Sequence, residues 1–315
     1  MAKKITMQKH TEKTFEEVFQ SFVTAKTALG VSNITIRNYH LNLHNISLHF
    51  DITMPFDELT KSKIDEAIVS MRNAGLAHNT VATYVRFIRT FLNWCNREGI
   101  SNINIPNVKE VETVKETYTD EELELLLRKP KRGCSFCEYR AWVIVNFLLN
   151  SGCRAATIRN IQNRDVDLNS GQIIFRHTKN KKIQVIPLCS VMIPILCDYM
   201  AIRGGKEDEY LFCDQYGKML SENALRLAIV SYNRRRGVNK TSIHLFRHTF
   251  ARKYLIDCGG DAFTLQKLLG HSTLAMTKHY CAIFDADLTK NYDNFSPLAQ
   301  ISSKSARIKI DKSRR

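Results

Sequence analysis

The sequence has no run of about 20 consecutive apolar residues, which is the length that a membrane-spanning helix requires. Its first residues, Met1 to Lys4, are basic but are not followed by the apolar stretch of a signal peptide. A glycine-rich phosphate loop of the GxxxxGK type is also missing, which argues against nucleotide-driven chemistry. We therefore expect a cytoplasmic protein without a transmembrane segment.

Acidic residues are in deficit. Asp and Glu number 31 against 46 Lys and Arg, which gives a formal net charge of +15 and a pI near 9.4. Such a surplus favours a polyanionic partner, and nucleic acid is the obvious one, although a protein that is merely basic is the alternative. Hydrophobic residues make up 44% of the 315 residues, which suffices for ordinary cores in about two domains.

The cysteines form no disulfide framework. There are nine of them, an odd number, and no secretory signal precedes them, so free thiols in a reducing compartment are expected. Cys134 and Cys137 form a single CxxC pair that could be half of a zinc site. Zinc normally takes four ligands, and no second pair stands at a matching distance, so free thiols remain the stronger interpretation.

The first hundred residues have helical periodicity. Thr14 and Glu17 form a capping box ahead of an apolar face. Further periodic segments run from about Ile34 to Leu48, from Thr60 to about Gly75, and from Asn79 to Arg97. Four helices are therefore predicted in this part of the chain.

Two arginines of the last of these segments, Arg86 and Arg89, fall outside its apolar stripe. They are candidates to face the phosphates of a nucleic acid. A solvated helix face is the more common explanation for any one of them taken alone.

A second domain is predicted to begin at the capping box of Thr119 and Glu122. An apolar helix over 139–149 follows, and then two short β-branched runs, 171–175 and 183–187, flank a lysine-rich turn as in a hairpin. The chain after Ser190 again has helical periodicity. The predicted fold class is thus mainly α with a small antiparallel β-sheet.

Five short motifs carry groups that could converge on one phosphate. Arginine matches phosphate oxygens with its planar fork, and tyrosine can act as a covalent nucleophile. The motifs are Ser151-Gly152-Cys153-Arg154, His177-Thr178-Lys179-Asn180, His244-Leu245-Phe246-Arg247-His248, Leu269-Gly270-His271, and Tyr280 nine residues after His271.

In order and spacing these motifs resemble those of the tyrosine recombinases, the phage-integrase type of DNA breaking-and-joining enzyme. The resemblance implies a disordered N-terminus (1–13), a helical core-binding domain (14–107), a linker (108–118), a catalytic domain (119–294) and a basic tail (295–315). It further implies cleavage of DNA through a 3′-phosphotyrosyl intermediate by a homotetramer on two duplexes. Accessory DNA-bending or directionality proteins are further partners of such enzymes.

The resemblance assigns Tyr280 as the nucleophile, and Arg154 and Arg247 as the clamp on the phosphate. His248 is expected to be structural, because it points to another side of the helix than its neighbour Arg247. The family usually carries an acidic residue three positions after the first arginine, where this chain has Thr157. This departure raises the question of what orients Arg154.

Lys179 is assigned as the general acid that protonates the departing 5′-oxygen, since two nearby arginines would lower its pKa. His244 and His271 are expected to bind the phosphate or to transfer protons to or from the tyrosine. Lys181 and Lys182 lie on the same turn as Lys179 and are predicted DNA contacts, with a solvated turn as the alternative.

No metal or other cofactor is expected, because in this chemistry arginines neutralise the charge that magnesium neutralises elsewhere. The expected role is integration, excision or transposition of a mobile element, with the enzyme located on that DNA or on a bacterial chromosome. No arm-binding domain is expected ahead of Thr14, which favours a simple recombinase. Two alternatives are a topoisomerase of type IB and a catalytically weak DNA-binding protein of the same fold.

Overall fold

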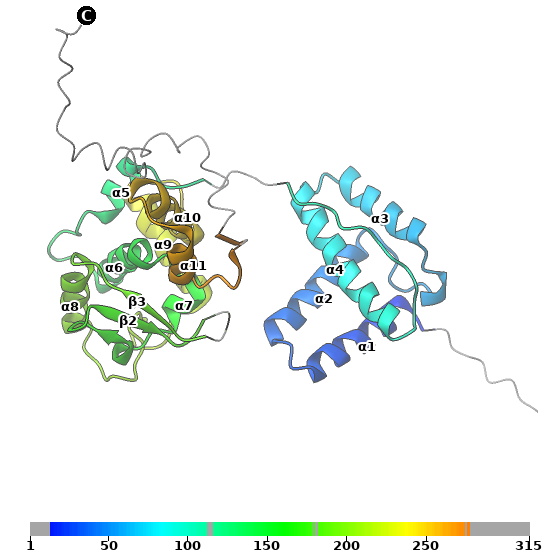
Figure 1. The fold of residues 1–315 in the computed structure, drawn as a ribbon, viewed down its shortest axis with the longest axis horizontal. Helices are drawn as coiled ribbons and strands as arrows, with labels where there is room; N and C mark the ends of the chain where they lie inside the picture. Colours follow the sequence, from blue (N-terminus) through cyan, green and yellow to red (C-terminus); the bar gives the residue numbers. More distant parts are fainter. Residues whose placement is uncertain (1–12, 112–115, 179, 181, 275, 278–315) are drawn as a thin grey trace, which may run out of the picture. The chain divides into compact units, whose positions relative to one another are not determined.

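The structure is a computed structural model that describes residues 13–111, 116–178, 180, 182–274 and 276–277 (Figure 1). The chain forms two compact units, residues 1–113 and 114–315. Among the described residues, no helix is both long and apolar enough to cross a membrane.

Residues 13–111 of the first unit form four α-helices, as the periodicity predicted. The Thr14 hydroxyl accepts the N–H of Glu17, and the Glu17 carboxylate accepts the N–H of Thr14, so the predicted capping box is confirmed. The elements are α1 (Phe15–Ala28), α2 (Asn33–Ser47), the 3₁₀ turn η1 (Phe56–Glu58), α3 (Lys61–Asn73) and α4 (His78–Arg97).

The core of the first unit is rich in aromatic rings. Phe91 of α4 lies at its centre, fully buried, with its ring centroid 5.1 Å from that of Phe15 and 5.5 Å from that of Phe22. Edge-to-face pairs of this kind add to the stabilisation that burial of the rings already provides. The apolar stripe of α4 therefore decides how the other helices pack.

The segment after α4 folds back onto that helix. The imidazole Nε2 of His78 lies 2.9 Å from the Lys109 carbonyl, and the Asn79 amide pairs with both backbone groups of Val111. Tyr118, at the other end of the predicted linker, is buried in the core of the second unit. The described ends of the 108–118 segment are thus each held by their own unit.

The second unit is mainly helical with a small antiparallel sheet, which confirms the predicted fold class. The strand order is β1-β2-β3, and Ile173 pairs with Ile186 in the hairpin. Strand β1 was not predicted, because two residues are too few to show a period. The elements are α5 (Asp120–Leu127), α6 (Phe136–Ser151), α7 (Ala155–Arg159), η2 (Asn163–Asp165), β1 (Val166–Asp167), β2 (Gln172–Phe175), β3 (Gln184–Pro187), α8 (Met192–Arg203), α9 (Glu222–Arg235), α10 (Ile243–Arg252), the π-turn η3 (Lys253–Asp257) and α11 (Ala262–Leu269).

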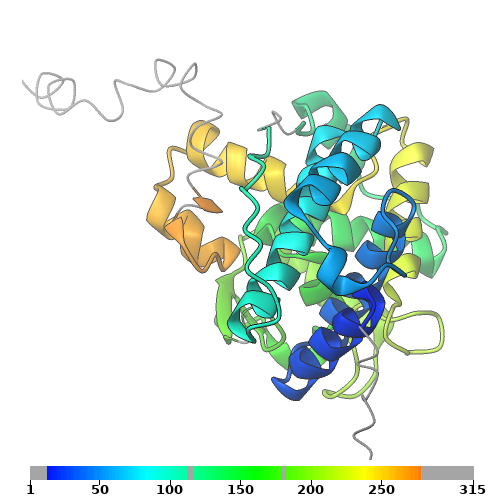
Figure 2. The same ribbon diagram turned by 90° about the vertical axis from the view of Figure 1, so that its right-hand side faces the viewer.

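Helix α6 is the central element of the second unit. It packs against α5, α8, α9 and α10, and Val143, Ile144 and Phe147 are fully buried. Helix α11, drawn in orange, lies against the end of α10 in Figures 1 and 2, where Leu265 and Leu269 contact Ala251. This packing brings the ends of α6, α10 and α11 into one region.

Candidate active site

Arg247 is the best-fixed charged side chain of this region. It lies on α10 and is only 5% exposed. Its Nη1 donates to the carbonyl of Gly152 over 2.9 Å, and its Nη2 donates to the carbonyl of Leu269 over 3.0 Å. Nη2 also lies 2.8 Å from Nε2 of His271. These three partners are neutral acceptors, which orient the guanidinium without themselves supplying a counter-charge.

Gly152 supplies one of these carbonyls because it ends α6 in the left-handed conformation, with φ of 57°. A Cβ at this position would lie 2.5 Å from Cδ1 of Phe250 and 2.8 Å from Cδ2 of Leu269. Real Cβ atoms do not approach other atoms so closely, and the backbone conformation itself favours glycine. The Gly-Cys-Arg turn thus depends on glycine to let α6, α10 and α11 meet.

His271 follows the C-terminal cap of α11 and is 9% exposed. Its Nδ1 lies 2.8 Å from Oγ1 of Thr277, on the side of the ring opposite Arg247. Burial, together with the nearby charges of Arg247 and Arg154, lowers the pKa of His271 to about 4. The ring is therefore neutral at physiological pH.

Arg154 is the N-cap residue of α7 and is half-buried. It lies close enough to His271 to depress that residue's pKa. Within the described part of the chain, no hydrogen bond or ion pair engages its guanidinium. Thr157, one turn later, is buried and places no carboxylate beside it. Among the described residues, no carboxylate is thus paired with Arg154.

Cys153, between Gly152 and Arg154, is not a competing nucleophile. Burial raises the pKa of its thiol to about 11, against the opposing effect of the two arginines. The thiolate is the nucleophilic form, so a thiol that stays protonated is inert.

The lysine-rich turn of the hairpin docks beside the same site. Asn180 donates from Nδ2 to the carbonyl of Gly270 over 3.1 Å, and Gln184 donates to the carbonyl of Leu268 over 2.8 Å. Thr178 closes the turn by exchanging two hydrogen bonds with the backbone of Lys182. Asn180, which follows Lys179, is thus held beside the residue that precedes His271.

Three predicted residues, Tyr280, Lys179 and Lys181, lie outside the described residues. Lys182 is exposed. His244 is also exposed, one helical turn before Arg247 on α10. Of the predicted catalytic set, the structure brings together Arg154, Arg247 and His271.

Comparison with known proteins identifies the family of the chain. Residues 116–286, more than half of it, match the family model described as the phage integrase family. The chain belongs to this family of tyrosine recombinases. Its members are site-specific DNA strand transferases, so the chain is an enzyme of that class.

The recombinase is similar along nearly its whole length to curated relatives. It is 28% identical to tyrosine recombinase XerC of Thermodesulfovibrio yellowstonii over 289 residues, 87% of this chain and 94% of the relative. It is 25% identical to tyrosine recombinase XerD of Staphylococcus epidermidis over 299 residues, 91% of this chain and 99% of the relative.

Two solved structures share the fold. One is the Tn1549 transposon integrase in complex with transposon right end DNA, with a TM-score of 0.70, 18% identity, and coverage of 88% of this chain and 99% of that one. The other is a λ integrase tetramer bound to a Holliday junction, with a TM-score of 0.69, 15% identity, and coverage of 86% and 78%.

Sequence reasoning missed three residues that shape the site of this recombinase, namely Thr277, Asn180 and Gln184. Two of them had a signal in the sequence. Thr277 stands between His271 and Tyr280, and Asn180 stands next to Lys179. Gln184 has none, because only the docking of the hairpin shows that it reaches α11.

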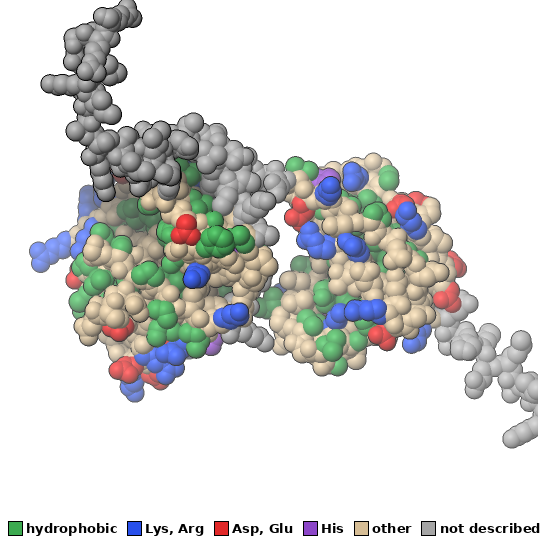
Figure 3. Space-filling view, in the orientation of Figure 1, with side chains coloured by type: hydrophobic (Ala, Val, Ile, Leu, Met, Phe, Trp, Pro, Cys, Tyr) green, Lys and Arg blue, Asp and Glu red, His purple; other side chains and the backbone are tan. Residues whose placement is uncertain are grey.

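The two predicted DNA contacts of the first unit differ. Arg86 forms an ion pair with Glu110 of the segment that folds back onto α4. Arg89 is half-buried, and none of the other described residues forms a hydrogen bond or ion pair with it. Figure 3 shows Lys and Arg side chains spread over the visible face of this unit. Both DNA contacts remain predictions.

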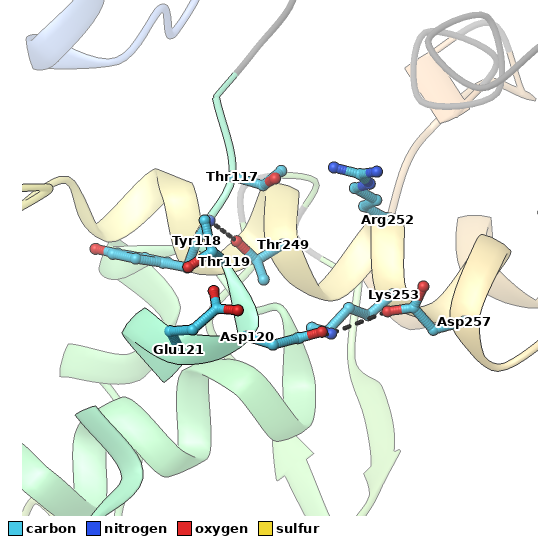
Figure 4. A pocket seen from close by; sticks show the side chains of 9 residues that line it. All are labelled: Thr117, Tyr118, Thr119, Asp120, Glu121, Thr249, Arg252, Lys253 and Asp257. Atoms are coloured by element: carbon cyan, nitrogen blue, oxygen red, sulfur yellow. Dashed lines mark hydrogen bonds and ion pairs between the residues drawn. The ribbon is translucent and has the colours of Figure 1, made fainter. Parts of the chain in front are cut away.

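A separate cavity of about 310 Å³ lies where the start of α5 meets the end of α10 (Figure 4). Lys253 bridges Asp120 and Asp257 there, and the Tyr118 N–H donates to the Thr249 hydroxyl. It contains none of the predicted catalytic residues. In the described residues of the recombinase, no three His, Cys, Asp or Glu side chains gather that could hold a metal ion.

Proposed function

We propose that this recombinase cleaves and rejoins DNA strands at specific sites through a 3′-phosphotyrosyl intermediate. One observation carries the proposal. Arg247 is oriented by two carbonyls and an imidazole, the guanidinium of Arg154 forms no hydrogen bond or ion pair with the described residues, and both arginines lie beside His271. Two guanidinium groups at one place suit the nonbridging oxygens of a phosphodiester, where negative charge develops during transfer.

In the covalent step, Oη of Tyr280 attacks the phosphorus and the bond from phosphorus to the 5′-oxygen breaks. Lys179 gives its proton to that oxygen, and His244 receives the proton that the tyrosine loses. His271 is the weaker candidate for proton transfer, because both of its ring nitrogens are engaged. Attack by a 5′-hydroxyl on the phosphotyrosine reverses the step and rejoins the strand.

The buried tyrosines of the second unit do not compete for this role. The hydroxyl of Tyr199 donates to the Leu211 carbonyl and that of Tyr232 donates to the Leu126 carbonyl, over 3.0 and 2.7 Å. Burial raises the pKa of both. These observations favour the motif tyrosine, Tyr280, as the nucleophile.

The working assembly that we propose is a homotetramer on two duplexes. In it, four basic residues contact phosphates, namely Arg86, Arg89, Lys181 and Lys182. The biological role that we propose for this recombination is integration, excision or transposition of a mobile element. It rests on the integrase-like order of the motifs.

The test uses nicked suicide duplexes made from the DNA that flanks the gene, incubated without added metal. We expect the wild type to form an SDS-resistant protein–DNA adduct and Tyr280→Phe to bind DNA without forming one. An adduct with the Phe variant would refute the nucleophile. Tight binding with no adduct from either protein would favour the DNA-binding alternative.

A second substrate separates recombinase from topoisomerase. Supercoiled plasmid that lacks the flanking sequence should stay supercoiled, because a recombinase acts at defined sites. Relaxation of such a plasmid by the wild type but not by Tyr280→Phe would favour the topoisomerase of type IB.

A further inference from the structure

His271 is held on both sides by a buried hydrogen-bonded relay. Nη2 of Arg247 lies 2.8 Å from its Nε2, and Oγ1 of Thr277 lies 2.8 Å from its Nδ1. Thr277 is fully buried, at 0% exposure. Thr277 also stands three residues before Tyr280 in the chain. The relay therefore runs from the segment that carries the nucleophile to the arginine clamp.

The identity of the partners decides where the histidine carries its proton. A guanidinium has only N–H donors, so Nε2 of His271 must accept the hydrogen bond and must be unprotonated. The neutral ring then carries its proton on Nδ1 and donates it to the hydroxyl oxygen of Thr277. The low pKa of His271 agrees with this neutral state.

The opposite tautomer would break the contact with the clamp. A proton on Nε2 would place an N–H against the N–H of Arg247, and a doubly protonated ring would add a positive charge there. The charged groups that act on the ring are Arg247 from α10 and Arg154 from the start of α7, and both oppose protonation.

We infer that Thr277 is a positioning residue: the contact with Arg247 requires the proton of His271 on Nδ1, the Thr277 hydroxyl accepts the hydrogen bond from that N–H, and His271 is thereby held so that it keeps Arg247 in its phosphate-binding orientation. The effect on catalysis rests on the function proposed above. The tautomer itself does not, because it is a property of the free protein.

The first test is nuclear magnetic resonance of the full-length protein with ¹⁵N-labelled histidine, in which His271→Gln assigns the signal by its loss. Long-range ¹H–¹⁵N correlations distinguish the two neutral tautomers. We expect the Nδ1-protonated form in the wild type and in Thr277→Ser, and a weaker preference for it in Thr277→Val, which keeps the shape but leaves the Nδ1 proton without an acceptor. An Nε2-protonated His271 in the wild type would overturn the inference, whatever happens to the folding of the variants.

The second test is the rate of adduct formation on suicide duplexes. Thr277→Val should slow cleavage about 10- to 100-fold, the scale expected when a buried donor loses its partner, with DNA affinity unchanged. Thr277→Ser should restore most of the rate, whereas a loss caused by packing alone would persist in it. An altered tautomer with an unaltered rate would refute the positioning role.

The outcomes of these two tests distinguish a failure of the inference about Thr277 from a failure of the proposed function. If the wild type forms no adduct, the recombinase chemistry is in question, while the tautomer spectra still decide the relay. If the wild type cleaves and Thr277→Val matches it in both tautomer and rate, the relay alone is wrong.

Discussion

The two units hold their arginines with different kinds of partner. Arg86 of the first unit is paired with a carboxylate, Glu110, and both side chains are about half exposed. Arg247 of the second unit is buried and bound by two carbonyls and an imidazole. A carboxylate cancels the charge of an arginine, whereas a neutral acceptor orients the side chain and leaves the charge for a substrate.

The contrast between charged and neutral partners also applies to Arg154, because Thr157 stands where the family usually has an acidic residue. An acid at this position would stand one turn from Arg154 and would neutralise part of the charge at the site. The described residues of α7 include no carboxylate, and no acidic group contributes to the pKa of His271. The described residues of α7 thus place no counter-charge beside Arg154, and substitutions at this site should have larger effects than in the first unit.

The largest effect is expected for Arg247→Ala. The variant loses a positive charge aimed at the phosphate and leaves two buried carbonyls without a donor, so cleavage of suicide duplexes should fall about 10³-fold. Arg236 is a matched control, because it also donates to backbone carbonyls, those of Leu125 and Arg128, away from the site. Arg236→Ala should lose stability but keep its cleavage rate. Equal cleavage losses in both variants would contradict the distinction.

The next effect is expected for Gly152→Ala. The variant adds a strained left-handed alanine and a clash with Phe250, which together should destabilise the second unit by about 2 to 4 kcal/mol. Gly30→Ala in the first unit is the control, since Gly30 has φ of 72° but nothing within 4 Å of a Cβ. It should cost about 1 kcal/mol. Urea unfolding followed by circular dichroism measures the free energy of unfolding of both variants. Similar losses of stability would show that the close approach of Phe250 and Leu269 to Gly152 does not contribute to the effect.

The third effect is a pH dependence that comes from His271. Its folded pKa of about 4 lies below its ordinary value of 6.5, so between these values the unfolded chain binds a proton that the folded protein does not. Stability is therefore lost as the pH falls from 6.5 towards 4, by about 2 to 3 kcal/mol from this group. Urea unfolding at pH 7.5 and 4.5 should show a larger loss in the wild type than in His271→Gln. Parallel losses would contradict a neutral buried His271.

The smallest effects are expected in the first unit. If α4 contacts phosphates, Arg89→Ala should reduce the slope of log affinity against log salt by about 1. Arg86→Ala should reduce it by less, because Glu110 already neutralises Arg86. The stability of either variant should change by no more than about 1 kcal/mol. Fluorescence anisotropy at a series of salt concentrations measures the slopes, and a larger change for Arg86→Ala would reverse the assignment.

Much of the fold could be predicted because its signals are local. The capping boxes of Thr14 and Thr119 and the hairpin of β2 and β3 depend on residues a few positions apart. The predicted ranges differ from the observed ones mainly at their ends. The strands begin at Gln172 and Gln184, each one residue later than predicted, since patterns do not mark the last hydrogen bond of an element.

For the candidate site, the sequence predicted the types of residue but not their contacts. The motifs indicated which arginines and histidines to consider, and the family affiliation confirms the class of enzyme. They did not indicate that the carbonyls of Gly152 and Leu269 hold Arg247, because a backbone oxygen has no signature in the sequence. Nor did they indicate the partner of Arg86, which lies 24 residues away in a segment without helical periodicity.

The sequence by itself determined the fold class, the recombinase family and the chemical groups available for phosphate chemistry. These follow from periodicity, motif order and composition, which are properties of the chain alone. Only the tertiary structure decided that two backbone carbonyls and an imidazole hold Arg247, that the guanidinium of Arg154 forms no hydrogen bond or ion pair with the described residues, and that Thr277 lies beside Nδ1 of His271. Charge, pKa and tautomer depend on burial and on the atoms within hydrogen-bonding distance, and packing brings those atoms together from segments as far as 95 residues apart.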